Sequence, residues 1–249
     1  MNSTVIQTTQ LFKSYSAGGH ASPVLCGIDM SVQKGECLFL AGPSGSGKTT
    51  LLSILGCVLS ADSGKVQVLD RDVTHLNSVE QSAFRREQIG FVFQRFHLFD
   101  ALTAQENVCI PLHLLRWTKS DAEKRASFLL DLLGLGSYLR RNVNQLSMGQ
   151  RQRVAVARAL AADPQLILAD EPTASLDEEA GLQAIAVLKD LCSRLNKTVV
   201  VVTHDARIFS FADRVLFLNK GRMESSVQAP AGEHSATPRV DNSHRREAA

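Results

Sequence analysis

The sequence lacks a long apolar run, a marked excess of one charge and a pair of cysteines at metal-binding spacing. Its apolar runs stop within about eight residues, whereas a membrane-spanning helix needs roughly 20. The first residues, MNSTVIQTTQLFKS, do not combine a charged start with an apolar segment, so no signal peptide is expected. We therefore expect a chain that is soluble by itself, has no membrane span and reaches a membrane only through a partner.

Charge and cysteine content exclude further classes of protein. A formal net charge of +2 gives no support for binding nucleic acid through bulk electrostatics. The cysteines are scattered and odd in number, which favours reduced, mostly buried thiols in a cytosolic setting over disulfides or a zinc site. They are Cys26, Cys37, Cys57, Cys109 and Cys192.

The chain's 249 residues, 44% of them hydrophobic, suffice for one large domain or for a core with a smaller lobe. Short alternating apolar runs over residues 4–40 predict an antiparallel β layer. Apolar strands that alternate with helical patterns predict a parallel sheet covered on both faces, and the helix-rich residues 95–162 indicate an inserted lobe. The later strands are expected at residues 64–70, 89–94, 166–170, 198–204 and 214–218.

The C-terminal segment differs in composition from the rest of the chain. After Met223 it is ESSVQAPAGEHSATPRVDNSHRREAA, rich in Ser, Ala, Pro and charged residues, with little to bury. Such composition is typical of disorder. We expect one domain over residues 1–223 and a disordered tail over residues 224–249.

The stretch GPSGSGKT, residues 42–49, fits the pattern G-x-x-x-x-G-K-[ST] between an expected strand and an expected helix. Its glycines allow backbone N–H groups to turn toward phosphate oxygens, Lys48 would reach the β- and γ-phosphates, and Thr49 would bind Mg²⁺. The alternative, an ordinary Gly/Ser turn, does not explain the flanking elements. The expected nucleotide-binding residues are Gly42, Pro43, Ser44, Gly45, Ser46, Gly47, Lys48, Thr49 and Thr50.

The stretch LILADEPTASLD places Asp170 and Glu171 at the end of an apolar strand. The carboxyl ends of parallel strands are where α/β sheets bind ligands. Asp170 would hold Mg²⁺ through its water shell, and Glu171 would polarise an attacking water as general base. The alternative for either residue is a solvated acidic turn.

A second helix start follows in LSMGQRQRVAVARAL, residues 146–160, where Ser147 is an expected N-cap. The first N–H groups of a helix lack partners, and its dipole is positive there, so this end can also hold an anion. The alternative is a capped helix on the surface.

These motifs together resemble the nucleotide-binding subunit of an ABC (ATP-binding cassette) transporter, with the motif order covering residues 4–223. The resemblance implies an α/β fold: a P-loop NTPase with a mainly parallel central sheet, an N-terminal antiparallel β subdomain and an inserted α-helical subdomain. It also implies ATP and Mg²⁺ as ligands and ATP hydrolysis as the activity.

Further site residues follow from the same resemblance. Gln94, at the end of IGFVFQ, matches the Q-loop glutamine that senses Mg²⁺ and the attacking water. Ser175, Leu176 and Asp177 match the D-loop, and Asp177 is expected at the nucleotide. His204 in VVVTHD matches the switch histidine that contacts the γ-phosphate.

Tyr15 in KSY is placed like the aromatic residue that stacks on adenine in the family. A tyrosine near a strand end is as often part of the core, so both interpretations stay open for this residue.

In this family two cassettes pair head to tail, so that each ATP is shared. Residues 42–49 of one copy would then face Ser147, Gly149 and Gln150 of the other, and the two helix starts would serve different ATP molecules. Met148 stands where the usual signature has its first glycine. A positive φ at Met148 would be strained, so we expect slightly altered packing, with a weakened site as the alternative.

The partner implied by the resemblance is an integral membrane permease, which would hold this chain at the inner face of the cell membrane from the cytoplasm. The segment RFHLF, residues 95–99, is either lobe core or a docking patch, and the family favours docking. RREQIGFVFQRFHLF, LTAQENV and VVVVTHD most resemble the lipoprotein-release and macrolide-export branch.

Three other classes of nucleotide-binding protein are alternatives to that branch. A cell-division or other mechanotransmission ATPase has nearly the same motifs. A DNA-repair ATPase is disfavoured by the short path from Gln94 to Ser147 and by the absent cysteine pairs. A kinase or GTPase would leave residues 147–150 and His204 without roles.

Overall fold

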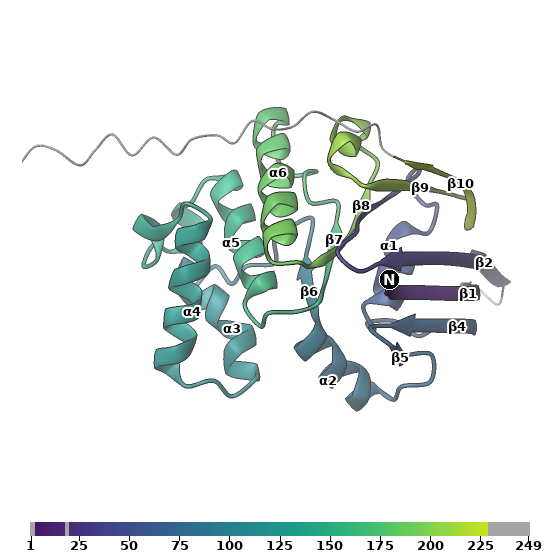
Figure 1. Cartoon of the computed structure of the whole chain (residues 1–249), viewed down its shortest axis with the longest axis horizontal. Helices are drawn as coiled ribbons and strands as arrows, with labels where there is room; N and C mark the ends of the chain where they lie inside the picture. The colour runs from purple at the N-terminus through teal and green to yellow at the C-terminus, as the bar shows by residue number, and fades with distance from the viewer. Residues whose placement is uncertain (1–2, 18–19, 229–249) are drawn as a thin grey trace, which may run out of the picture.

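A computed structural model describes residues 3–17 and 20–228 of the chain (Figure 1). Two β-sheets lie side by side, and a lobe of helices extends from the larger sheet. The strands are β1 (Thr4–Ala17), β2 (His20–Gln33), β3 (Cys37–Ala41), β4 (Ser63–Val68), β5 (Arg71–Asp72), β6 (Ile89–Val92), β7 (Leu166–Asp170), β8 (Thr198–Thr203), β9 (Arg214–Asn219) and β10 (Arg222–Gln228). The helices are α1 (Lys48–Leu55), α2 (Ser78–Gln88), α3 (Ala104–Leu114), α4 (Lys119–Leu132), α5 (Met148–Leu160) and α6 (Glu178–Arg194), with 3-10 turns η1 (Gly136–Tyr138), η2 (Val143–Gln145) and η3 (Ala206–Phe211).

The smaller sheet has the strand order β2-β1-β4-β5, and all its pairs are antiparallel. The alternating apolar residues of β1 and β2 bury one face, with Ile6, Leu11 and Ile28 fully inaccessible. This sheet is the antiparallel β subdomain that the sequence predicts.

The larger sheet has the order β10-β9-β3-β8-β7-β6. The strands β9, β3, β8, β7 and β6 are parallel, and only the edge strand β10 is antiparallel to its neighbour. The predicted mainly parallel central sheet is therefore confirmed. Because β8 lies between β3 and β7 and all three strands are parallel, the segments that follow them meet at one edge of the sheet.

The parallel strands separate two hydrophobic clusters. Side chains alternate between the faces of a strand, so Phe39 belongs to one cluster, while Leu38 and Leu40 belong to the other. The cluster of Phe39 continues into the helical lobe, and the cluster of Leu38 and Leu40 continues through α1 to the smaller sheet. The strand that leads into residues 42–49 is thus buried on both faces.

The lobe consists of α3, α4 and α5, in agreement with the predicted inserted α-helical subdomain (Figure 1). Its helices begin at polar caps: Thr103 forms a capping box with Glu106, and Thr118 accepts a hydrogen bond from the N–H of Asp121. These caps satisfy N–H groups that the first turn of a helix leaves without partners. Helix α2 begins at a third capping box, between Asn77 and Glu80.

The C-terminal boundary differs from the expected one. Residues 224–228 belong to β10, which pairs with β9 along its length, because the Ser-rich segment continues the hydrogen-bonded ladder of a hairpin. The rest of the expected tail, residues 229–249, lies outside the described residues. Within the described part of the chain, no helix is long and apolar enough to cross a membrane.

Candidate functional site

The loop over residues 42–49 joins β3 to α1 and has the backbone geometry of an anion-binding turn. Gly47 is the N-cap of α1 with φ 104°. Because glycine has no side chain, no side-chain hydrogen bond caps this helix. The first N–H groups of α1 are therefore available to an external anion. An added Cβ at Gly47 would lie 2.8 Å from Val24 O, whereas one at Gly45 would meet no atom within 4 Å. The loop is thus tight toward the protein and open outward, which fits a phosphate group.

Lys48 begins α1 and is buried, with only 6% of its surface exposed. Its Nζ donates hydrogen bonds to Gly42 O at 2.8 Å and to Pro43 O at 3.0 Å. A lysine ammonium that binds carbonyl oxygens of the same loop brings a positive charge to the place where phosphates would sit. The ammonium group of Lys48 therefore lies at the loop, and its binding of phosphates stays a prediction.

Thr49 and Asp170 bring two oxygen atoms together from α1 and β7. Thr49 Oγ1 donates to Asp170 Oδ1 at 3.1 Å. Burial raises the pKa of Asp170, and the nearby Glu171 carboxylate raises it further, against the lowering effects of the Thr49 hydrogen bond and of Lys48.

Hydroxyl and carboxylate oxygens suit Mg²⁺, and water or phosphate oxygens would complete its shell. Among residues 3–17 and 20–228, no group of three or more His, Cys, Asp or Glu side chains forms a metal cage. Mg²⁺ usually binds with few protein ligands, so this donor set fits it.

Glu171 follows β7 in an unusual backbone conformation, with φ 47°. Its N–H donates to Val202 O, and its Oε1 lies 2.8 Å from His204 Nδ1. His204 follows β8, the parallel neighbour of β7, so the two strand ends lie close together. A non-glycine residue in the left-handed region costs about 1–3 kcal/mol, and such strain is common at functional sites.

A cleft of about 460 Å³ brings most of the predicted residues together. Its volume lies in the range of about 300–1,000 Å³ that is typical of small-molecule sites. Tyr15 lines it with 45% of its surface exposed, so the alternative that Tyr15 is part of the core is wrong. Sequence analysis did not identify Val24, which lies in no motif. The lining residues are Tyr15, Val24, Ser44, Gly45, Gly47, Lys48, Thr49, Thr50, Gln94, Glu171 and His204.

Gln94 lies in the cleft just after β6, beside the segment that begins with Glu171. Ser175 Oγ donates to the backbone oxygen of Gln94 at 2.8 Å and so joins the two segments. Asp177 does not line the cleft. It caps α6 by accepting a hydrogen bond from the N–H of Ala180.

The second helix start also lies outside the cleft. Ser147 caps α5 and forms a capping box with Gln150. Met148 is the first residue of the helix, and its φ is not positive, so the strain that a positive φ would cause does not arise. An added Cβ at Gly149 would meet only Ala180 Cβ, at an ordinary 3.8 Å. Nothing among the described residues thus requires glycine at position 149.

A G-x-x-x-x-G-K-[ST] loop between a parallel strand and a helix, with a carboxylate at the end of another parallel strand of the same sheet, defines a P-loop nucleotide-binding protein. A family model described as "ABC transporter" matches residues 25–174. The chain belongs to this family and represents its ATP-binding domain.

Relatives and solved structures agree with this assignment. The chain is 41% identical over 223 residues to the "Lipoprotein-releasing system ATP-binding protein LolD" of Legionella pneumophila (strain Paris), covering 90% of this chain and 98% of the relative. It is 43% identical over 213 residues to the "Macrolide export ATP-binding/permease protein MacB" of Photorhabdus laumondii, covering 86% of this chain and 33% of that longer protein. A solved dimer of an ATP-binding cassette in a post-hydrolysis state with ADP and Pi superposes with a TM-score of 0.82 at 38% identity, covering 91% of this chain and 100% of the other.

Proposed function

We propose that this chain hydrolyses ATP as a head-to-tail dimer and drives a separate membrane subunit. One observation carries the proposal: the cleft is lined by part of the loop of residues 42–49 together with Gln94, Glu171 and His204, while the helix start at Ser147 lies outside it. A second copy can bring its Ser147 to the open side of the cleft, and a two-fold axis then forms two equal sites. The related cassette, solved as a dimer with ADP and Pi, supports this arrangement.

In the proposed site, ATP supplies the phosphoryl group, and the N–H groups of the loop with Lys48 hold its phosphates. Thr49, Asp170 and Gln94 hold Mg²⁺, and Tyr15 stacks on the base. Ser147, Gly149 and Gln150 of the second copy, with Asp177 at the interface, complete the enclosure.

The hydrolytic step is assigned to residues at the ends of β7 and β8. Glu171 accepts a proton from the attacking water as general base, which requires its ionised form. His204 lies 2.8 Å from this carboxylate and orients it, and Gln94 positions the water on the other side. The hydrogen bond from Ser175 Oγ to Gln94 O holds the segment of Gln94 beside the segment that begins with Glu171.

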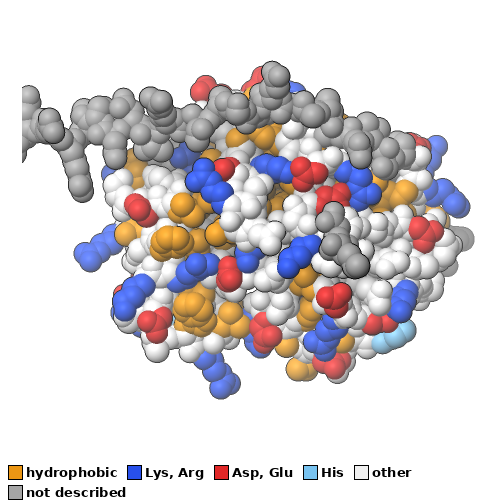
Figure 2. Space-filling model, in the orientation of Figure 1, with side chains coloured by type: hydrophobic (Ala, Val, Ile, Leu, Met, Phe, Trp, Pro, Cys, Tyr) orange, Lys and Arg blue, Asp and Glu red, His pale blue; other side chains and the backbone are white. Residues whose placement is uncertain are grey.

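The membrane partner is proposed from the relatives' names and from the surface of the lobe. Within the aromatic segment that follows Gln94, Phe96 is buried and Phe99 is 56% exposed. Phe96 is therefore part of the lobe core, while Phe99 is available for the docking patch that the resemblance favours. Figure 2 shows hydrophobic side chains on one face of the lobe. Among the lobe's large hydrophobic residues, Leu114, Trp117 and Phe128 are exposed.

We propose that an integral membrane permease binds this face and holds the chain at the inner side of the cell membrane. The names of the lipoprotein-releasing and macrolide-export relatives favour export or lipoprotein release as the task. Purification with the membrane subunit, followed by an efflux or release assay, distinguishes this task from mechanotransmission without cargo.

A mixing experiment tests the shared site. Lys48→Ala and Ser147→Arg proteins are each expected to lack ATPase activity. Mixed in equal amounts, they should recover about a quarter of the wild-type rate, because half the dimers are mixed and each of these has one intact site. No recovery under conditions where subunits exchange would refute the dimer. Two preparations of Lys48→Ala protein, mixed under the same conditions, serve as the control and should recover no activity.

A further inference from the structure

The turn after Gln94 has a backbone conformation that its own residues do not favour. Phe96 has φ 57° and the next residue, His97, has φ 47°, so two consecutive non-glycine residues lie in the left-handed region. This region is unfavourable for a residue with a side chain, because Cβ crowds the following carbonyl oxygen. Contacts from outside the turn must therefore hold it in this conformation.

Arg158 on α5 supplies the main contact. Its Nη1 donates to His97 O at 2.5 Å and its Nη2 donates to Phe96 O at 2.6 Å, so one planar guanidinium holds the carbonyl groups of both strained residues. Hydrogen bonds from a charged donor are about twice as strong as neutral ones. The forked donors of arginine fix two acceptors at once, which a lysine cannot do.

Other side chains hold the backbone on both sides of this turn. Ser175 Oγ binds Gln94 O before it. Beyond it, the fully buried Asn107 accepts from the N–H of Phe99 and donates to its carbonyl oxygen. The conformation of residues 94–99 is thus set by distant side chains, and Arg158 acts on its most strained part.

Helix α5 joins this turn to the other functional end of the lobe. Arg158 lies eleven residues beyond the N-cap Ser147, which corresponds to about 16 Å at 1.5 Å per residue. Val154, Ala155 and Ala157 are fully buried between these positions and fix the helix in the core. A displacement of the Ser147 end can therefore reach the turn through a rigid, packed helix.

We propose that Arg158 is a positioning residue that holds the turn at Phe96 and His97, keeps Gln94 in the cleft and links it to the Ser147 end of α5. The role of the Ser147 end rests on the proposed function. The effect of Arg158 on the turn does not depend on it.

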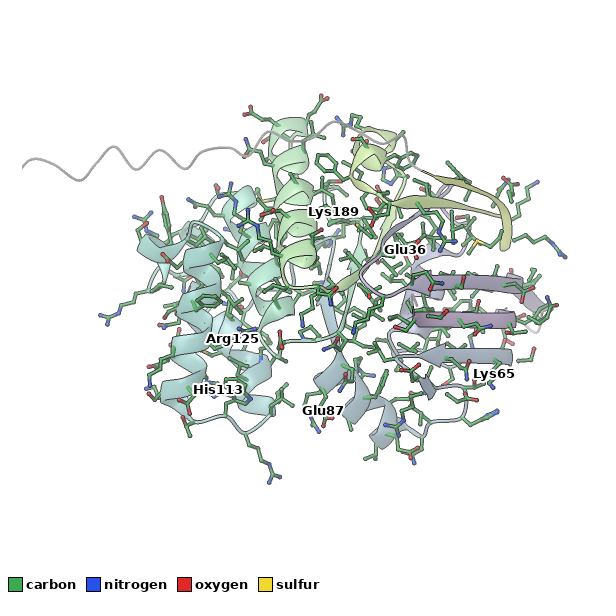
Figure 3. All side chains as sticks on the ribbon, viewed as in Figure 1. Glu36, Lys65, Glu87, His113, Arg125 and Lys189 are labelled. Atoms are coloured by element: carbon green, nitrogen blue, oxygen red, sulfur yellow. The ribbon has the colours of Figure 1, made fainter. Side chains whose placement is uncertain are left out.

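The test uses Arg158→Met, which keeps the aliphatic stem but removes both donors, and Arg158→Lys, which keeps only a point charge. Arg125→Met is the matched control. Arg125 on α4, labelled in Figure 3, also donates to two backbone carbonyl groups, but these belong to Leu160 and Ala161 and not to the turn.

The first readout is amide hydrogen exchange of residues 95–98 in nucleotide-free protein. Arg158→Met should speed this exchange about tenfold or more, Arg158→Lys should fall between it and the wild type, and Arg125→Met should leave it within about twofold. Exchange at the wild-type rate in Arg158→Met would overturn the proposal. If Arg158→Met does not fold, the same comparison is made with Arg158→Lys.

The second readout is ATP hydrolysis. Arg158→Met should lower kcat about tenfold or more with KM within about twofold, because the loop of residues 42–49 is untouched. Equal falls in kcat for Arg158→Met and Arg125→Met would show a general loss of structure and overturn the link to Gln94. A wild-type chain without any ATP hydrolysis would instead refute the proposed function, and the exchange experiment would still decide the role of Arg158.

Discussion

Replacement of Gly149 by alanine separates the needs of the fold from those of the proposed interface. Gly149 lies in the first turn of α5 without a positive φ, and an added Cβ would meet Ala180 Cβ at 3.8 Å, an ordinary contact. Alanine also restricts the unfolded chain more than glycine does. Gly149→Ala should therefore stabilise the protein by about 0.5–1 kcal/mol. For a domain of this size, the corresponding rise in Tm is about 1–4 °C.

We expect the same substitution to abolish the ATP-dependent dimer, because the added methyl group would take up space at the helix start that the proposed interface brings against the nucleotide of the second copy. Thermal unfolding by circular dichroism measures the first effect. Size-exclusion chromatography with ATP, in the background of Glu171→Gln to prevent turnover, measures the second.

Gly64→Ala is the matched control for the stability argument. Gly64 has φ 94°, and an added Cβ there would lie 2.2 Å from Gln10 O, so this variant should be clearly destabilised. A fall in Tm for Gly149→Ala would refute the argument from backbone and space. A wild-type ATP-dependent dimer in the stabilised variant would place the interface elsewhere than at this end of α5.

Three further predictions concern the site and the thiols. Glu171→Gln should reduce ATP turnover about 10²-fold or more while nucleotide affinity, measured by fluorescence titration, stays within about twofold; unchanged turnover would exclude Glu171 as general base. Because burial raises the pKa of Asp170 above its usual 3.8, the folded state binds more protons than the unfolded state between these values, and stability falls as pH rises through that window. Asp170→Asn keeps an acceptor for Thr49 and removes the loss of stability that ionisation of Asp170 causes. The Tm of this variant should therefore exceed that of the wild type at pH 7 and approach it near pH 4, while its Mg²⁺ affinity falls about 10–100-fold. An equal Tm difference at both pH values would contradict the raised pKa of Asp170. Thiol labelling of the native protein should modify Cys26 alone, since the other cysteines are buried and burial raises the pKa of Cys37 and Cys192 to about 12. Rapid labelling of a second cysteine before unfolding would contradict the burial of these thiols.

Much of the fold and the candidate site follows from local sequence signals. The strand LILAD was predicted at the same residues, 166–170, that form β7, because a short continuous apolar run before two carboxylates is typical of a buried parallel strand. The N-cap at Ser147 was also predicted correctly, since side-chain capping depends on a few adjacent residues.

The features that were missed depend on weaker or more distant signals. Helix α2 buries only Phe84, so its apolar periodicity is faint, although the N-x-x-E spacing of Asn77 and Glu80 marks its start. Val24 enters the cleft only because the β1–β2 sheet lies beside the loop. The contacts of Arg158 join residues about 60 positions apart, and no local pattern distinguishes this arginine from the others on α5.

The hydrophobic cluster around Phe39 has a consequence for transplanting parts of this protein. Val108, Leu112 and Leu129 of the lobe share this one cluster with Val199 and Val201 of the larger sheet. Within the described residues, the core of the lobe is therefore continuous with one side of the sheet. A chimera that exchanges only residues 95–162 between two cassettes would therefore join surfaces that did not evolve together, and a viable graft must also carry the matching residues on that side of the sheet.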